Sequence, residues 1–195
     1  MIQSVSLTGE TTGSLTYDDL SDIIDQLSDV FHVNASDIDT VINYVVTGIL
    51  NLTIPSDILD NDIIKYLQDS LGTVLKVHPQ NIVITINGNK DIIYQVTTAS
   101  FNVTDSINNE TQSEGFISKL NSDLNNTNSE ILITNKHSKD EVQIVVVALI
   151  DPVDQTQPII DPITDVQKIV EDLGFLDGTV QSNSYSFLFF FYHIE

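Results

Sequence analysis

The chain contains no cysteine, no tryptophan and no arginine among its 195 residues. Without cysteine it can form no disulfide, no thiolate zinc site and no cysteine nucleophile. Its seven basic residues are all lysine and face 28 acidic residues, which gives a formal net charge of -21. Proteins that bind nucleic acid take most of their affinity from basic side chains that neutralise phosphates. We therefore exclude nucleic acid as a direct partner.

The sequence also lacks a long apolar run. No stretch approaches the 18 or more apolar residues that span a bilayer, and the negative charge repels anionic lipid head groups, so we expect no membrane insertion. A strand-like segment, 2–7, follows Met1 directly, so we also expect no signal peptide. With 41% hydrophobic and 18% charged residues, the chain is too apolar for a disordered acidic tail and should fold.

One pattern repeats four times along the chain. Each repeat contains an amphipathic helix, a strand, a turn and a second strand. The expected helices are 18–31, 61–75, 113–124 and 163–176. The expected strands are 2–7, 37–46, 49–55, 81–86, 91–101, 130–134, 142–150, 178–182 and 186–194. The expected hairpin turns contain Gly48, Gly88, Lys139 and Asn183.

The helices are predicted from the spacing of apolar residues. In the second helix, Ile63, Leu67 and Leu71 recur every four residues, which places them on one face. The strands are rich in β-branched residues, as half-buried strands usually are. The predicted core comprises Ile82, Ile84, Ile86, Ile131, Ile133, Leu67 and Leu71.

The repeat predicts an α+β fold. Four αββ units behind one opening strand divide most simply into two tandem ferredoxin-like (β-αββ-αββ) sandwiches, with antiparallel sheets and the helices on one face. We expect residues 1–90 to form the first domain and residues 91–195 the second. The proline-containing stretch 151–162 would be a long surface loop of the second domain.

Within the second repeat, the segment 71–96 (LGTVLKVHPQNIVITINGNKDIIYQV) resembles SEA-like domains. These are ferredoxin-like modules of cell-surface and extracellular-matrix proteins, so the resemblance implies a surface or extracellular structural protein. Some such domains cleave themselves at a Gly-Ser bond in a hairpin between strands. None of the four expected turns contains Gly-Ser, and the one such pair, Gly13-Ser14, precedes the first helix, so we expect no self-cleavage.

No catalytic motif is present. The sequence has no serine-hydrolase, zinc-protease, phosphate-loop or dinucleotide-binding spacing. The four histidines, His32, His78, His137 and His193, occur once in each repeat but at different places in it, which argues against a shared cluster. We therefore expect no catalytic residue and no enzyme activity.

Aspartate is the main ionisable residue, and oxygen-rich clusters are what calcium prefers. Asp57, Asp60 and Asp62 are the best candidates, in the loop before the second helix. They lack the central glycine and distal glutamate of an EF-hand, and an acidic first turn is already explained by the helix dipole. We expect no cofactor, with calcium at these three residues as the alternative.

Two surfaces have both a structural and a binding interpretation. Asp22, Asp25 and Asp29 form an acidic stripe on the first helix, which is either a solvated face or a partner-binding stripe. The aromatic run near the end is either interior strand or an assembly surface buried by a neighbouring subunit. Its members are Phe187, Phe189, Phe190, Phe191 and Tyr192.

Five Asn-x-Ser/Thr sequons, at Asn34, Asn51, Asn102, Asn109 and Asn125, would suit a secreted protein, although this composition gives about three by chance. Repeats of one supersecondary unit commonly build rods and arrays. We therefore expect a non-enzymatic structural module of a virion surface, filament or extracellular coat, which self-associates through strand edges or apolar sheet faces. The alternative is an adhesin-type module that binds a protein or glycan.

Overall fold

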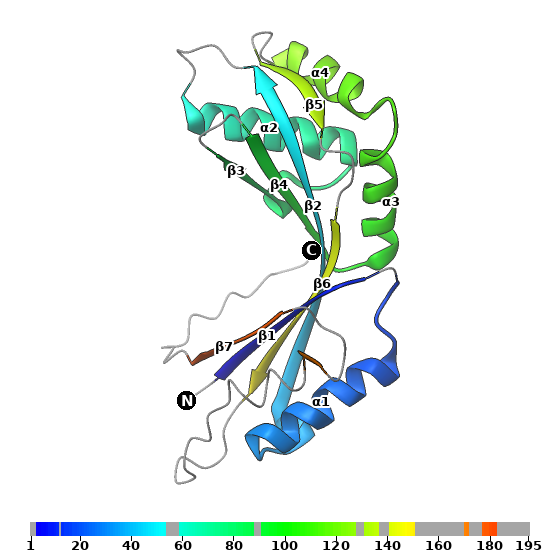
Figure 1. Cartoon of the computed structure of the whole chain (residues 1–195), viewed down its shortest axis with the longest axis vertical. Helices are drawn as coiled ribbons and strands as arrows, with labels where there is room; N and C mark the ends of the chain where they lie inside the picture. Colours follow the sequence, from blue (N-terminus) through cyan, green and yellow to red (C-terminus); the bar gives the residue numbers. More distant parts are fainter. Residues whose placement is uncertain are drawn as a thin grey trace, which may run out of the picture. The chain divides into compact units, whose positions relative to one another are not determined.

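A computed structural model describes residues 3–11, 13–53, 59–87, 91–127, 131–136, 141–150, 170–171 and 177–182. Within these residues the fold is α+β, as predicted, with four α-helices and a single antiparallel sheet (Figure 1). The helices are α1 (Tyr17–Phe31), α2 (Asp60–Leu75), α3 (Phe101–Thr111) and α4 (Phe116–Thr127). The strands are β1 (Gln3–Glu10), β2 (Ile38–Thr53), β3 (Ile82–Ile86), β4 (Asp91–Thr98), β5 (Leu132–Lys136), β6 (Glu141–Ile150) and β7 (Asp177–Ser182).

The strands follow the order β3-β4-β2-β6-β1-β7 across the sheet, and β5 also pairs with β2. The chain forms two compact units. Unit 1 comprises Met1–Gly9, Leu15–Ile42 and Val145–Glu195, and unit 2 comprises Glu10–Ser14 and Asn43–Ile144. The units are thus interleaved along the sequence, whereas the repeat predicted one boundary near residue 90. Strands β2 and β6 each continue from one unit into the other.

Unit 2 is a helix-covered antiparallel sheet. Its strands lie in the order β3-β4-β2-β5, and each neighbouring pair is antiparallel. Ile92 of β4 lies opposite both Leu50 and Ile86, so these three side chains point to one face of the sheet. Helices α2, α3 and α4 all contribute side chains to the core on that face.

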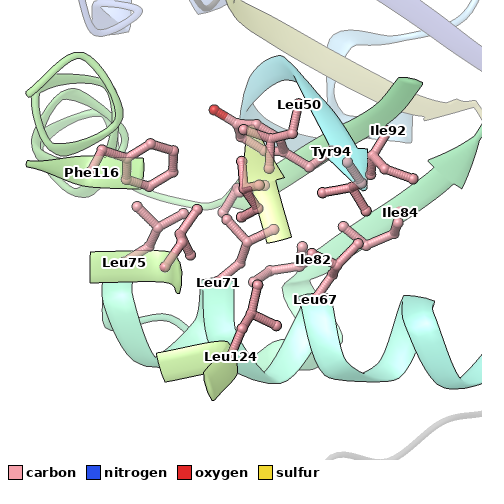
Figure 2. Packing of buried hydrophobic residues seen from close by; sticks show 14 of the residues in the cluster. Leu50, Leu67, Leu71, Leu75, Ile82, Ile84, Ile92, Tyr94, Phe116 and Leu124 are labelled. Atoms are coloured by element: carbon pink, nitrogen blue, oxygen red, sulfur yellow. The ribbon is translucent and has the colours of Figure 1, made fainter. Parts of the chain in front are cut away.

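The core of unit 2 consists of aliphatic side chains with two aromatic rings. Figure 2 shows Leu67 and Leu71 of α2 pointing toward Ile82 of β3. Of the predicted core residues, six are buried and Ile86, near the end of β3, is half-buried. The four-residue spacing in α2 therefore identified the buried face correctly. The fully buried aromatic side chains are Tyr94 and Phe116.

Unit 1 combines α1 with β1, the first part of β2, the end of β6, and β7. Helix α1 begins at a capping box, in which Thr16 and Asp19 each bond the other's main chain. It ends at His32 in the left-handed conformation, with φ 52°. Strand β1 pairs with β7 in antiparallel register, so β1 has β6 and β7 as its two neighbours. Buried apolar residues of this unit include Val5, Leu7, Ile23, Leu27, Ile38, Val146, Ala148 and Ile150.

Two predicted hairpins are wrong. Gly48 was expected in a turn, but it lies inside the continuous strand β2, opposite Tyr94. Strands β5 and β6, expected to pair across a turn, both pair with β2 instead. The β3–β4 hairpin is confirmed, because β3 and β4 pair directly on either side of the predicted Asn87–Asn89 turn. The single long strand β2, which has residues in both units, therefore replaces the first predicted hairpin.

Helix α3 was not predicted. Of its apolar residues Phe101, Val103 and Ile107, only Ile107 is buried and Val103 is exposed; its other buried positions are the threonines Thr104 and Thr111. Asparagine and threonine are weak helix formers, so neither composition nor apolar spacing indicates a helix here. The buried threonine hydroxyls are satisfied locally, as where Thr104 donates to Ser100 O at 3.0 Å.

Some predicted elements lie outside the described residues. Of the expected helix 163–176, only Val170 and Glu171 are described, and both are helical. The expected strand 178–182 is present as β7. The loop 151–162, the turn at Asn183 and the strand 186–194 fall outside the described part of the chain.

Candidate assembly edge

Strand β3 forms one edge of the sheet, with β4 as its only neighbour in the described structure (Figure 1). The Asn87 N–H donates to Asp91 O at 2.8 Å, which fixes the phase of the ladder. In an antiparallel pair, alternate residues direct their main-chain groups toward the partner and away from it. Residues 83, 85 and 87 therefore face β4, and the N–H and C=O groups of Ile82, Ile84 and Ile86 point away from the sheet.

The outward groups of Ile82 already have partners. Gln68 of α2 donates from Nε2 to Ile82 O at 2.7 Å. The N–H of Ile82 donates to Pro79 O in the short 3-10 helix Pro79–Asn81. In the described structure, the outward groups of Ile84 and Ile86 have no such partner. The open part of this edge is therefore two residues long and offers two donors and two acceptors.

The side chains of β3 do not protect this edge. Natural sheets commonly block their edges with lysine, proline, a bulge or a covering element. Strand β3 reads Ile-Val-Ile-Thr-Ile and has no charge, no proline and no register shift. On its solvent side Val83 is 52% exposed, and Thr85 is exposed as well. Its shortness and the two hydrogen bonds at Ile82, from Gln68 and to Pro79, are the only protection that the described residues give it.

At the opposite edge of unit 2, strand β5 is hydrogen-bonded by a helix side chain. Asn121 of α4 accepts from the Ile133 N–H at 2.8 Å and donates to the Ile133 C=O at 2.9 Å. This side chain satisfies both main-chain groups of Ile133, on the unit 2 edge formed by β5. In the described structure, unit 2 therefore has one edge whose residue Ile133 is bonded by a helix side chain and one edge that is open at Ile84 and Ile86.

The acidic candidates for calcium do not form a described cluster. Asp60 and Asp62 are exposed in the first turn of α2, where a carboxylate suits the helix dipole. Asp57 lies outside the described residues. Among residues that the structure describes, no group of three histidine or acidic side chains could hold a metal ion. The helix dipole accounts for the position of the two described carboxylates.

The described histidines have local structural roles. His32 ends α1, and His78 precedes the 3-10 helix, where its Nδ1 accepts from the Gln80 N–H at 3.2 Å. His137 and His193 lie outside the described residues. So does the aromatic run Phe187, Phe189, Phe190, Phe191 and Tyr192.

The acidic stripe lies on the solvent side of α1. Asp22, Asp25 and Asp29 are all exposed, and the opposite positions Ile23 and Leu27 are buried. This agrees with a solvated face. Partner binding by the stripe remains a prediction.

The sequence matches no protein-family model, and no curated protein is similar enough to count as a relative. Among the described helices, none has the length and apolar character needed to cross a bilayer.

Proposed function

We propose that this protein is a non-enzymatic structural module that assembles through the edge of its sheet. The open, uncharged edge of β3 is the observation that carries the proposal. In a chain of net charge -21, a strand without charge is a place where two molecules can approach with little local repulsion. The contrast with the closed edge at Asn121 and Ile133 indicates which edge is available.

We also infer that both units are ferredoxin-like sandwiches, with unit 2 inserted into unit 1 rather than following it. Unit 2 runs β-α-β-β-α-β, with α3 and α4 together in the second helical position, and its sheet order is the one that this path gives. Unit 1 follows the same path through β1, α1, β2, β6 and β7. The helical residues Val170 and Glu171 stand where its second helix belongs.

The proposed setting is a virion surface, filament or extracellular coat. SEA-like modules, which the second repeat resembles, belong to cell-surface and extracellular-matrix proteins, which supports the extracellular part of this proposal. Four of the five sequon asparagines, Asn34, Asn102, Asn109 and Asn125, are exposed as glycosylation requires, and Asn51 is half-buried in β2. High acidity would keep such a module soluble before it assembles.

Light scattering across a concentration series tests the assembly. We expect the mass to rise above that of the 21.6 kDa chain as concentration increases, and to rise further with NaCl, because salt screens the repulsion between acidic molecules. A mass that stays at 21.6 kDa at every concentration and salt level would refute the proposal.

A further inference from the structure

The free main-chain groups on the open edge of β3 are arranged so that they can pair with the same groups of a second copy. Ile84 and Ile86 each offer one N–H and one C=O in the plane of the sheet, by the ladder phase set at Asn87 and Asp91. When two identical strands meet in antiparallel orientation across a two-fold axis, each N–H of one copy faces a C=O of the other. Each copy can then satisfy all four groups of the other.

The contact at Gln68 selects the register. Pairing centred on Ile84 would place Ile82 opposite Ile86 of the other copy, but both outward groups of Ile82 are already bonded. Pairing centred on Thr85 places Ile84 opposite Ile86 and Ile86 opposite Ile84. This register forms four main-chain hydrogen bonds and uses none of the groups of Ile82.

We propose that two copies of this chain pair antiparallel through β3, with Thr85 of one copy opposite Thr85 of the other. The inference rests on the proposed function and names the partner for that same edge. Pairing would extend the sheet of unit 2 from one copy into the next.

Burial along the core face of β3 favours the same register. Ile82 and Ile84 are 1% and 7% exposed, whereas Ile86 is only half-buried. In the proposed pair, Ile86 lies beside Ile84 of the second copy, which extends the apolar face over it. On the solvent face the two Thr85 hydroxyls lie opposite each other, a pairing that favours neighbouring strands.

Cysteine substitution tests the register directly, because the natural chain has no cysteine. Thr85 would occupy a pair without hydrogen bonds, with Cα atoms about 4.5 Å apart, within the range that a disulfide bridges. Thr85→Cys should therefore give a disulfide-linked dimer on mild oxidation with diamide. Val83→Cys is the matched control on the same face of β3. The two copies of residue 83 would lie four residues out of register, roughly 13 Å apart, so it should not cross-link.

Charge substitution tests the same contact without a covalent bond. Thr85→Lys places two ammonium groups directly opposite each other and should weaken the dimer about fivefold in sedimentation. Val83→Lys adds the same charge two residues away and should leave the dissociation constant within about twofold. Both side chains are exposed, and circular dichroism checks that both variants remain folded.

The outcomes separate this inference from the proposed function. A cross-linked dimer from Thr85→Cys but not from Val83→Cys, with a weaker dimer for Thr85→Lys alone, supports the β3 pair. Equal cross-linking by both cysteines, or an oligomer unaffected by Thr85→Lys, overturns it while edge assembly elsewhere stands. A wild-type chain that remains monomeric overturns both.

Discussion

The Asn121 side chain pairs with the main chain of Ile133 as a residue of a neighbouring strand would. Its Oδ1 accepts from the Ile133 N–H and its Nδ2 donates to the Ile133 C=O, at 2.8 and 2.9 Å. One helix side chain thereby supplies both hydrogen bonds that a missing strand would have made. The contact also holds α4 to β5 at a fixed position along the strand.

Removing this amide should destabilise the protein. Asn121→Leu keeps much of the side-chain volume but leaves the N–H and C=O of Ile133 without partners, so we expect a cost of about 1–3 kcal/mol in the free energy of unfolding. Urea denaturation measures it. Asn125→Leu, at an exposed position one turn along α4, is the control and should change stability by less than about 0.5 kcal/mol. Equal effects from the two variants would show that the pairing contributes nothing specific.

Replacing Ser70 should make the protein more stable. Its hydroxyl is buried in α2 and has no hydrogen-bond partner among the residues that the structure describes. Ser70→Ala removes this group and raises helix propensity, so we expect stability to increase by about 1 kcal/mol. Thr104→Val is the contrasting variant, because the buried Thr104 hydroxyl is bonded to Ser100 O and to Thr98 Oγ1. It should lower stability in the same urea experiment. A loss of stability in Ser70→Ala would mean that the hydroxyl has a partner in solution.

The capping box of α1 should make stability depend on acid pH. The Thr16 hydroxyl, and secondarily the Thr16 main-chain N–H, donate to the Asp19 carboxylate and hold its pKa below the usual value of an aspartate. A lowered folded-state pKa means that this stabilisation is complete above the unfolded pKa and is lost as pH falls through the folded one. Wild type should therefore lose its advantage over Asp19→Asn as pH falls from about 5 to about 2. Thermal melts of both proteins across this range measure the change; a constant difference would contradict it.

The acidity should make the free protein respond to salt without a dedicated cation site. Self-repulsion at a net charge of -21 weakens the compact state at low ionic strength, and NaCl should raise the melting temperature by screening it. Calcium at matched ionic strength should add little. A large extra shift from micromolar calcium would instead indicate a specific site, for which Asp57, Asp60 and Asp62 are the candidates. Asp60→Asn combined with Asp62→Asn would then locate it.

The sequence predicted the elements better than their pairing. Apolar spacing located α1, α2 and α4, because such periodicity reflects which face of a helix is buried. It could not show that β2 continues through Gly48, because glycine is also the usual turn residue. A polar turn motif likewise suggested a hairpin between β5 and β6, although β2 offers each of them a longer partner.

The contacts of Gln68 and Asn121 with the edge strands could not be predicted from the sequence, because they join residues far apart in the chain. Gln68 and Asn121 reach strand residues 14 and 12 positions further along the chain. Nothing in their local sequence distinguishes them from exposed amides such as Asn125 or Asn126. Their role appears only when the helix is placed over the edge strand. The open edge of β3 could not be predicted from the sequence either, because only the order of the strands in the sheet shows which strand lies at an edge.

The pairing of β1 with β7 sets the order in which the protein can fold. Val5 pairs with Val180, so the contact closes a loop of nearly the whole chain, whereas β3 and β4 are neighbours in sequence. Loop closure over such a distance is entropically costly and slow. We expect pulsed hydrogen exchange during refolding to protect β3 and β4 before β1 and β7. During synthesis β1 emerges well before β7, so β1 must wait for most of the intervening chain before this pairing can form.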